Sequence, residues 1–270
     1  MKKIYLSPPS VSEIEYKYIK DAIRSNWIAP VGPFVEKFEN AIKQYVGVKY
    51  SLCVNSGTSA IHLALKVLGI KKGDVVFCQN FTFIGSVSPV TFCNATPVFI
   101  GSEINTWNVS PDTLRETIKK FIKKGKKPKA IIVVHLYGMP SKVLELKSIS
   151  REFQIPIIED AAEALGSSYD GKKCGSLFDI GILSFNGNKI ITTSGGGAIL
   201  SNNKKYIEKA KYLANQAKEN LFHYQHKEIG FNYKISNLLS AIGVGQLENI
   251  EKKIRKRRNN FIIYKNLLSK

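Results

Sequence analysis

The stretch Leu52-Cys53-Val54-Asn55-Ser56-Gly57-Thr58-Ser59-Ala60 joins a short apolar strand to a helix that continues to Leu68. After the turn, Ile61, Leu65 and Leu68 recur at the spacing of one helix face. The same alternation of strand and helix continues along most of the chain. It predicts an α/β fold, with a mainly parallel sheet that carries helices on both of its faces.

The other expected elements follow the same periodicity rules. The patterns predict strands at Leu52–Asn55, Val75–Cys78, Pro97–Ile100, Ala130–His135, Pro156–Ile158, Ile180–Phe185 and Ala198–Leu200. They predict helices at Thr58–Leu68, Ile84–Phe92, Pro111–Ile122, Lys142–Phe153 and Lys204–Ala217, with Ser110 as an N-cap. Residues 12–46 are expected to form two helical pieces around a turn at 29–33, and residues 247–270 one charged helix.

Composition limits the class of protein. The 270 residues are 44% hydrophobic, which supports a sizeable core. Apolar runs such as Ala130–Val134 are far shorter than the roughly 20 residues that a membrane span needs. The N-terminus lacks the apolar segment of a secretion signal, so we expect a cytoplasmic protein without a membrane partner. Cys53, Cys78, Cys93 and Cys174 show no metal-binding spacing, and we expect buried, reduced thiols and no metal.

The formal net charge of +19 raises the question of a nucleic-acid partner. Much of the excess lies in two lysine-rich runs, at Lys119–Lys129 and Lys252–Arg258. No aromatic RNA-binding signature accompanies them, and solvated helix faces explain them as well. We therefore expect no nucleic-acid partner, although a basic nucleic-acid-binding module stays as a remote alternative. A positive field would also favour an anionic substrate.

Three features at strand ends carry chemistry. The turn at Asn55–Ala60 places backbone amides and hydroxyls at a helix N-terminus, where a phosphate fits, although an ordinary N-cap has the same pattern. Asp160 ends an apolar strand, where a buried carboxylate needs a partner or caps a helix starting near Ala161. Lys189 follows the strand-like Ile182–Phe185 and precedes Gly195-Gly196-Gly197, whose backbone allows close approach to a ligand.

Together these features suit one chemistry. A lysine amine can hold an aldehyde cofactor as a Schiff base, and a fixed carboxylate can keep a pyridinium nitrogen protonated. A desolvated lysine has a depressed pKa, which frees the amine for imine formation and proton transfer. Because ligands of parallel sheets gather at the carboxyl ends of the strands, we expect Gly57, Asp160 and Lys189 to share one pocket.

The chain resembles the DegT/DnrJ/EryC1/StrS family of nucleotide-sugar aminotransferases, which have the fold-type-I aspartate aminotransferase architecture. The matching stretches are Trp27–Gly32, Asn55–Ala60, Glu159–Gly166, Ser184–Lys189, Gly195–Gly197 and Gly230–Ser236. The resemblance implies pyridoxal 5'-phosphate as cofactor and glutamate as amino donor. It implies cofactor contacts from Gly57, Thr58, Phe83, Asp160, Glu163, Ser184, Lys189 and Asn232.

The implied roles differ between these residues. Lys189 would be the Schiff-base lysine and the catalytic acid and base, and Asp160 would bind the pyridine nitrogen. Phe83 would stack on the ring, and Glu163 would lie on the side of its 3-hydroxyl group. Gly57, Thr58 and Ser184 would hold the phosphate, while Asn232 would reach the phosphate of the neighbouring subunit in a homodimer. The sugar substrate would face Trp27, Ile28, Ala29, Pro30 and Asn188.

A narrower resemblance concerns the substrate. The stretches Ser7–Pro9, Asn26–Pro30, Ala161–Gly166 and Asn186–Thr193 resemble transaminases of the bacillosamine pathway. Those enzymes place a 4-amino group on UDP-4-keto-6-deoxy-N-acetylglucosamine. Two positions depart from the family pattern: Gly101 stands where an acid is frequent, and Lys234 replaces an arginine.

The resemblance also predicts the domain organisation. Residues 1–245 would form the cofactor-binding large domain, with the helical segment 1–46 at its start, and residues 246–270 would begin a C-terminal segment. Family members continue with a small domain that this chain is expected to lack. A truncated member that binds cofactor but is catalytically impaired is therefore an alternative to an active aminotransferase.

Overall fold

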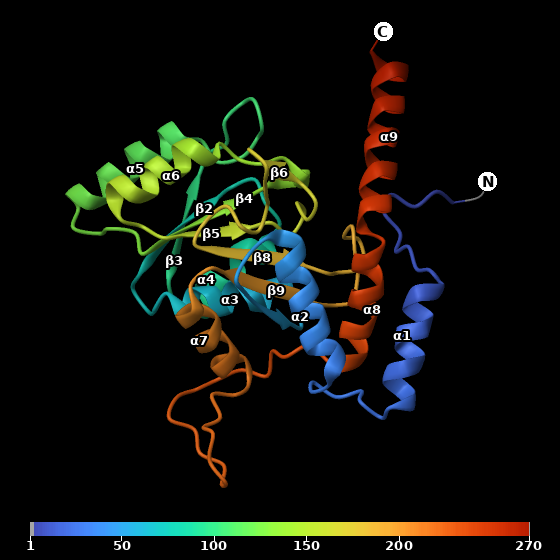
Figure 1. Ribbon diagram of the computed structural model, residues 1–270. Coiled ribbons are helices and arrows are strands. Elements are labelled where there is room, and N and C mark those ends of the chain that lie inside the picture. Colours follow the sequence, from blue (N-terminus) through green and yellow to red (C-terminus); the bar gives the residue numbers. More distant parts are fainter. Residues whose placement is uncertain (1–2, 270) are drawn as a thin grey trace.

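A seven-stranded sheet forms the centre of the computed structural model, which describes residues 3–269 (Figure 1). The strand order is β1-β9-β8-β5-β4-β2-β3. Pairings are parallel from β8 to β3, while β9 runs antiparallel to β1 and to β8. The strands are β1 (Tyr50–Val54), β2 (Val75–Gln79), β3 (Thr96–Ile100), β4 (Ala130–Val134), β5 (Ile157–Asp160), β8 (Ile180–Ser184) and β9 (Gly197–Ser201).

Helices connect the strands and extend the fold at both ends. The α-helices are α1 (Glu13–Arg24), α2 (Pro33–Val46), α3 (Gly57–Val67), α4 (Ser88–Phe92), α5 (Pro111–Lys123), α6 (Val143–Phe153), α7 (Lys204–Ala214), α8 (Asn237–Glu248) and α9 (Ile250–Leu268). Two short 3-10 helices are η1 (Ile84–Ser86) and η2 (Leu136–Gly138), and a small hairpin comprises β6 (Ser168–Tyr169) and β7 (Lys172–Lys173).

Both faces of the sheet are covered, which confirms the predicted α/β architecture and its mainly parallel sheet. One core cluster lies between the sheet and helices α3, α4 and α7. On the opposite face, α5 and α6 cover β2, β4 and β5, while α2 and α8 cover β1, β8 and β9. Figure 1 shows α1 and α2 beside α8, and α9 projecting away from the sheet. Strands β2, β4, β5 and β9 are buried throughout because helices exclude water from both faces of the sheet, whereas β3, at one edge of the sheet, is partly exposed.

Several local predictions are confirmed. Residues 12–46 form α1 and α2, and Pro33 begins α2 at a position where a missing backbone N–H is tolerated. The hydroxyl of Ser110 accepts a hydrogen bond from the Thr113 N–H and caps α5. All four cysteines are buried and free. Within residues 3–269, no helix combines the length and apolar character that crossing a bilayer requires.

Other boundaries were predicted wrongly. The expected helix Ile84–Phe92 is divided into η1 and α4, with Pro89 in the first turn of α4. The helix expected to reach Ala217 ends at Ala214, because Gln216 and Ala217 take φ angles of 56° and 52°. The charged segment after residue 247 belongs to two helices, α8 and α9, which meet at Asn249. The hairpin of β6 and β7 was not predicted.

One buried histidine predicts acid sensitivity. His62 on α3 packs against Phe92 and Phe231, and its Nδ1 lies 3.1 Å from the Tyr233 hydroxyl oxygen. Burial lowers the pKa of His62 from 6.5 to about 4. In the unfolded chain this histidine becomes protonated near pH 6.5, whereas in the native state it stays neutral down to about pH 4. The free energy of unfolding therefore falls as the pH drops from 6.5 toward 4. We expect a loss of about 2 kcal/mol over this interval, measured by urea unfolding.

The matched variants are His62→Gln and His223→Gln, since His223 is exposed. His62→Gln removes the titrating group and is expected to flatten this part of the stability profile. His223→Gln is expected to leave the profile of the parent protein unchanged. Equal pH profiles for the parent protein and His62→Gln would contradict the assignment.

Candidate active site

The carboxyl ends of β1, β2, β4, β5 and β8 open into one cavity of about 390 Å³. The first residues of β9 lie at the same edge, because this strand runs in the opposite direction. The lining includes Asn55, Ser56, Gly57, Thr58, Thr82, Phe83, Ser86, Asp160, Glu163, Ser184, Asn186, Asn188, Lys189, Gly195 and Gly196. The volume is within the range of small-molecule sites.

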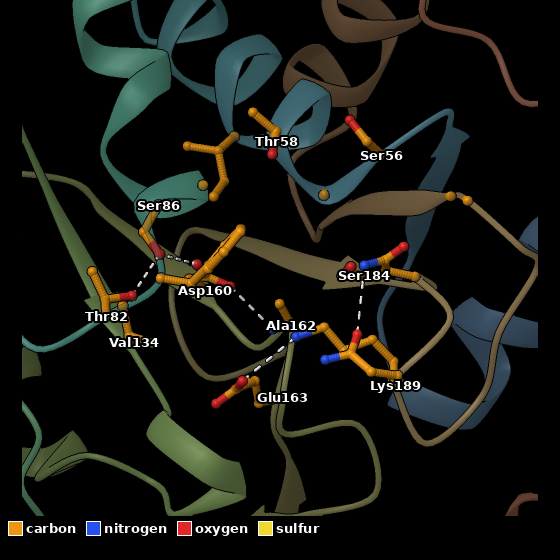
Figure 2. A pocket seen from close by; sticks show the side chains of 18 of the residues that line it. Ser56, Thr58, Thr82, Ser86, Val134, Asp160, Ala162, Glu163, Ser184 and Lys189 are labelled. Atoms are coloured by element: carbon orange, nitrogen blue, oxygen red, sulfur yellow. Dashed lines mark hydrogen bonds and ion pairs between the residues drawn. The ribbon is translucent and has the colours of Figure 1, made fainter. Parts of the chain in front are cut away.

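The structure brings together most of the predicted residues. Eight of them line this cavity: Gly57, Thr58, Phe83, Asp160, Glu163, Ser184, Asn188 and Lys189. The predicted proximity of Gly57, Asp160 and Lys189 therefore holds in the structure. Figure 2 shows Thr58, Asp160, Glu163, Ser184 and Lys189 around the same space.

The predicted substrate segment and the predicted cross-subunit residue lie elsewhere. Trp27, Ile28, Ala29 and Pro30 do not line the cavity of this chain. Asn237 holds their segment at the start of α8, since its Nδ2 donates to the Trp27 carbonyl at 2.7 Å and its backbone N–H to the Ala29 carbonyl at 2.8 Å. Asn232 is exposed, and its carbonyl accepts a hydrogen bond from Asn55 Nδ2 at 3.2 Å. The roles of these residues toward a substrate or a neighbouring subunit remain predictions.

The N-terminus of α3 forms one wall. Ser56 is the N-cap, and its Oγ accepts a hydrogen bond from the Ser59 N–H at 3.0 Å. The turn is thus an N-cap and also part of the cavity wall, so the two alternatives for this motif are compatible. The first N–H groups of α3 have no partner within the helix, and with the helix dipole they favour an anion such as phosphate.

Close backbone packing shapes this wall. A Cβ atom on Gly197 would lie 2.5 Å from both the Gly57 nitrogen and the Ser56 carbonyl carbon. Only glycine lets the first residue of β9 pass so near the start of α3. The side chain of Ser184, at the end of β8, also faces Gly57. The helix N-terminus and Ser184 are therefore held against each other by the sheet.

Asp160 forms the floor of the cavity and is 4% exposed. Its Oδ2 accepts a hydrogen bond from Ser86 Oγ at 2.7 Å, and its Oδ1 accepts one from the Ala162 N–H at 3.0 Å. No helix begins at Ala161, which argues against the alternative that Asp160 is a helix cap. Burial raises the pKa of Asp160 above its usual value, although these hydrogen bonds and the charge of Lys189 oppose the rise.

Ser86 and Thr82 are site residues that sequence reasoning missed. The hydroxyl oxygens of Thr82 and Ser86 are 2.7 Å apart (Figure 2). Ser86 Oγ donates its single hydrogen bond to Asp160, so the Thr82 hydroxyl is the donor in its hydrogen bond with Ser86. This chain of hydroxyl groups orients the Asp160 carboxylate from the end of β2. Serine in a segment expected to be helical gave no signal for this role.

The neighbouring acid, Glu159, points to the other side of β5 and fixes the strand end. It is fully buried and accepts hydrogen bonds from the backbone N–H groups of Gly175 and Leu177. His135 Nε2 lies 3.0 Å from Glu159 Oε1, while its Nδ1 accepts from the Ser141 N–H. His135 therefore donates a hydrogen bond from its Nε2–H group to Glu159. These contacts hold β4, β5 and the loop before β8 together beneath Asp160.

Lys189 and Glu163 lie beside each other in the cavity lining. Their Nζ and Oε1 atoms are 3.5 Å apart, and the side chains are 15% and 29% exposed. The other oxygen of Glu163 accepts a hydrogen bond from the Tyr137 N–H at 2.8 Å. Tyr137 takes a φ angle of 52°, an uncommon conformation for a residue with a side chain. The loop after β4 thus fixes the carboxylate that lies beside the lysine.

The residues present fit a cofactor that combines a phosphate, a pyridine ring and an aldehyde. The start of α3 and Ser184 suit the phosphate, and the exposed ring of Phe83 is available for stacking. The buried Asp160 carboxylate lacks a charged partner in direct contact within residues 3–269. A protonated ring nitrogen would supply that partner. Lys189 supplies the amine that an aldehyde requires.

A comparison with known families identifies the class of protein. Residues 9–270 match the DegT/DnrJ/EryC1/StrS aminotransferase family, and the chain belongs to this family. The expected fold-type-I architecture and the expected cofactor, pyridoxal phosphate, are confirmed.

Individual relatives cover nearly the whole chain. EpsN of Bacillus subtilis strain 168, named as a pyridoxal phosphate-dependent aminotransferase, is 52% identical over 99% of this chain and 69% of its own length. GDP-perosamine synthase of Escherichia coli O157:H7 is 37% identical over 98% of this chain and 71% of its own. The structure of Helicobacter pylori PseC, an aminotransferase in pseudoaminic acid biosynthesis, aligns with a TM-score of 0.90 and 27% identity. That alignment covers 98% of this chain and 70% of PseC.

Proposed function

We propose that this chain transfers an amino group from glutamate to the 4-keto carbon of a UDP-linked 4-keto-6-deoxy-N-acetylhexosamine. The observation that carries the proposal is the shared cavity in which Lys189, the buried Asp160 and the N-terminus of α3 converge. Bacterial glycan biosynthesis would use the resulting amino sugar. Pyridoxal phosphate, when bound, supplies an aldehyde that accepts the amino group and a ring that withdraws electrons.

Each residue then has a defined task. Lys189 would hold the cofactor covalently, and its Nζ would carry a proton in both halves of the reaction. Asp160 would keep the ring nitrogen protonated, and the hydroxyl groups of Ser86 and Thr82 hold the carboxylate in a fixed orientation. Glu163 lies beside Nζ and would contact the 3-hydroxyl side of the cofactor ring. Gly57, Thr58 and Ser184 hold the phosphate, and Phe83 excludes water from one face of the ring.

The nucleotide and sugar are supported by the narrower sequence resemblance to bacillosamine-pathway transaminases. Two relatives whose names refer to other sugars also bear on which nucleotide sugar is the substrate. One is the UDP-4-amino-4,6-dideoxy-N-acetyl-beta-L-altrosamine transaminase of Campylobacter jejuni serotype O:23/36, which is 36% identical over 89% of this chain and 62% of its own length. GDP-perosamine synthase bears a different nucleotide in its name. An experiment must therefore compare UDP-linked with GDP-linked substrates.

We also propose a homodimer in which the sites are shared. Asn232 lies on the surface outside its own cavity, as a residue directed to a neighbouring phosphate would. Trp27 and Ile28 are about half exposed and lie outside the cavity, so contact with a substrate would arise in the assembled dimer. Asn188, in contrast, lines the cavity of its own chain and would contact the sugar there.

The experiment is a spectroscopic titration followed by a substrate panel. The purified protein with pyridoxal phosphate is expected to show the visible band of a lysine-bound cofactor. Glutamate should remove this band, and a 4-keto sugar nucleotide should restore it. Presenting the same 4-keto-6-deoxy-N-acetylhexosamine on UDP, and a 4-keto-6-deoxyhexose on GDP, separates the two substrate classes. Restoration by the GDP compound alone would overturn the proposed substrate, and a band unaffected by glutamate would overturn transamination.

A further inference from the structure

A second cavity, of about 460 Å³, adjoins the first. The two share Glu163, Asn188 and Lys189 in their linings. The loops after β4 and β5 form part of its wall, and α9 contributes Arg257 and Arg258 on the other side. A molecule that reacts beside Lys189 can therefore extend toward these two guanidinium groups.

The first turns of α9 are seated against the active-site loop. A Cβ atom on Gly166, which has a φ angle of 96°, would lie 2.5 Å from Ile254 Cδ1. Ile254 is buried by this contact, and Tyr45 donates a hydrogen bond to Glu251 one turn earlier. Arg257 and Arg258 follow Ile254 by three and four residues, so they lie above it on the same helix face. Their direction toward the cavity thus follows from the packing of the helix.

The charges in this second cavity do not balance. Glu163 is the one acidic residue in the described lining, and it already contacts Lys189 and the Tyr137 N–H. Neither Arg257 nor Arg258 forms an ion pair with another residue in 3–269. Two guanidinium groups therefore face the space beside the lysine without a carboxylate partner. Guanidinium groups bind carboxylate and phosphate oxygens through paired, charge-assisted hydrogen bonds.

We propose that Arg257 and Arg258 form an oxyanion subsite that anchors a substrate beside Lys189. The proposal rests on the proposed function for the reaction at the lysine. The oxyanion can come from either substrate: the diphosphate of the nucleotide sugar or a carboxylate of glutamate. The subsite positions a substrate without participating in proton transfer, so it acts on affinity and not on attachment of the cofactor.

The test compares two charge-matched double variants of the holoenzyme. Arg257→Gln with Arg258→Gln removes the subsite. Arg255→Gln with Lys256→Gln makes the same charge change on exposed residues of α9 that lie outside the cavity lining. Calorimetric titration with UDP and with GDP measures nucleoside diphosphate binding, and loss of the cofactor band measures apparent glutamate affinity. A third variant, Arg257→Lys with Arg258→Lys, tests for partial rescue by charge alone.

A weakening of about tenfold or more is expected in the first variant for one ligand class, with the control unchanged. Loss confined to the nucleotides assigns the subsite to the diphosphate, and loss confined to glutamate assigns it to a carboxylate. Unchanged affinity for every probe overturns the proposal, as does an equal loss in the control variant. The nucleotide titration does not require turnover, so failure of glutamate to remove the band would refute the proposed function separately.

Discussion

Replacement of Lys189 by alanine is expected to abolish amino transfer and the visible band of the bound cofactor. The change removes the amine that holds the cofactor and the group that moves the proton in both half-reactions. Loss of acid–base catalysis alone lowers rates by about 10²- to 10⁴-fold, and loss of covalent attachment adds to this. Stability should change little, because the lysine side chain makes one 3.5 Å ion pair and is partly exposed.

A readout independent of turnover accompanies this prediction. Borohydride reduction of the loaded protein should fix the cofactor on the peptide that contains Lys189, and mass spectrometry identifies that peptide. Lys172→Ala is a suitable control, because Lys172 is an exposed lysine in β7. An unchanged spectrum in Lys189→Ala, or reduction that labels a different lysine, would refute the assignment of Lys189.

The sequence predicted those site residues that directly follow strands. Apolar runs locate β1, β5 and β8, and in parallel topology their carboxyl ends meet at one edge. The sequence pattern alone therefore places Gly57, Asp160 and Lys189 in one pocket. The contribution of Ser86 could not be predicted, because Ser86 lies 74 residues from Asp160 in the sequence. Its contact with Asp160 also depends on the direction in which its hydroxyl group points. No local pattern carries information about such a contact.

The sequence patterns also did not predict how helices α8 and α9 pack. Helix α8 packs against both α1 and α2, and apolar residues therefore occupy most of its surface. It therefore lacks the one-sided periodicity that identifies surface helices, and its two glycines lower helix propensity further. Arg257 and Arg258 were grouped with a solvated charge run. Only the seating of Ile254 against Gly166 shows that they face the active-site region.

Replacement of Asp160 by asparagine is expected to have opposite effects on stability and on activity. Burial raises the pKa of Asp160, so ionising this carboxylate in the cofactor-free native state costs free energy. Asparagine keeps the shape, and reversal of the Thr82–Ser86 hydrogen bonds lets Ser86 accept from the new amide. We expect the cofactor-free variant to be more stable at neutral pH by roughly 1 kcal/mol, or about 2–4 °C in Tm. With cofactor, loss of the charge partner should lower kcat/KM by about a hundredfold or more.

The pH dependence separates this explanation from a simple packing effect. While the wild-type carboxyl group is protonated, the native state bears no free-energy cost of burying its charge. Because the pKa of Asp160 is raised in the native state, the free-energy cost of ionising the carboxyl group grows as the pH rises through that pKa. The stability difference between the cofactor-free proteins should therefore be small in acid and increase toward neutral pH. Asp170→Asn, an exposed change in the turn between β6 and β7, should show no such trend. A cofactor-free Asp160→Asn protein that is less stable than wild type at neutral pH would show that the carboxylate is already compensated, and that a cationic ring nitrogen is not needed to balance it.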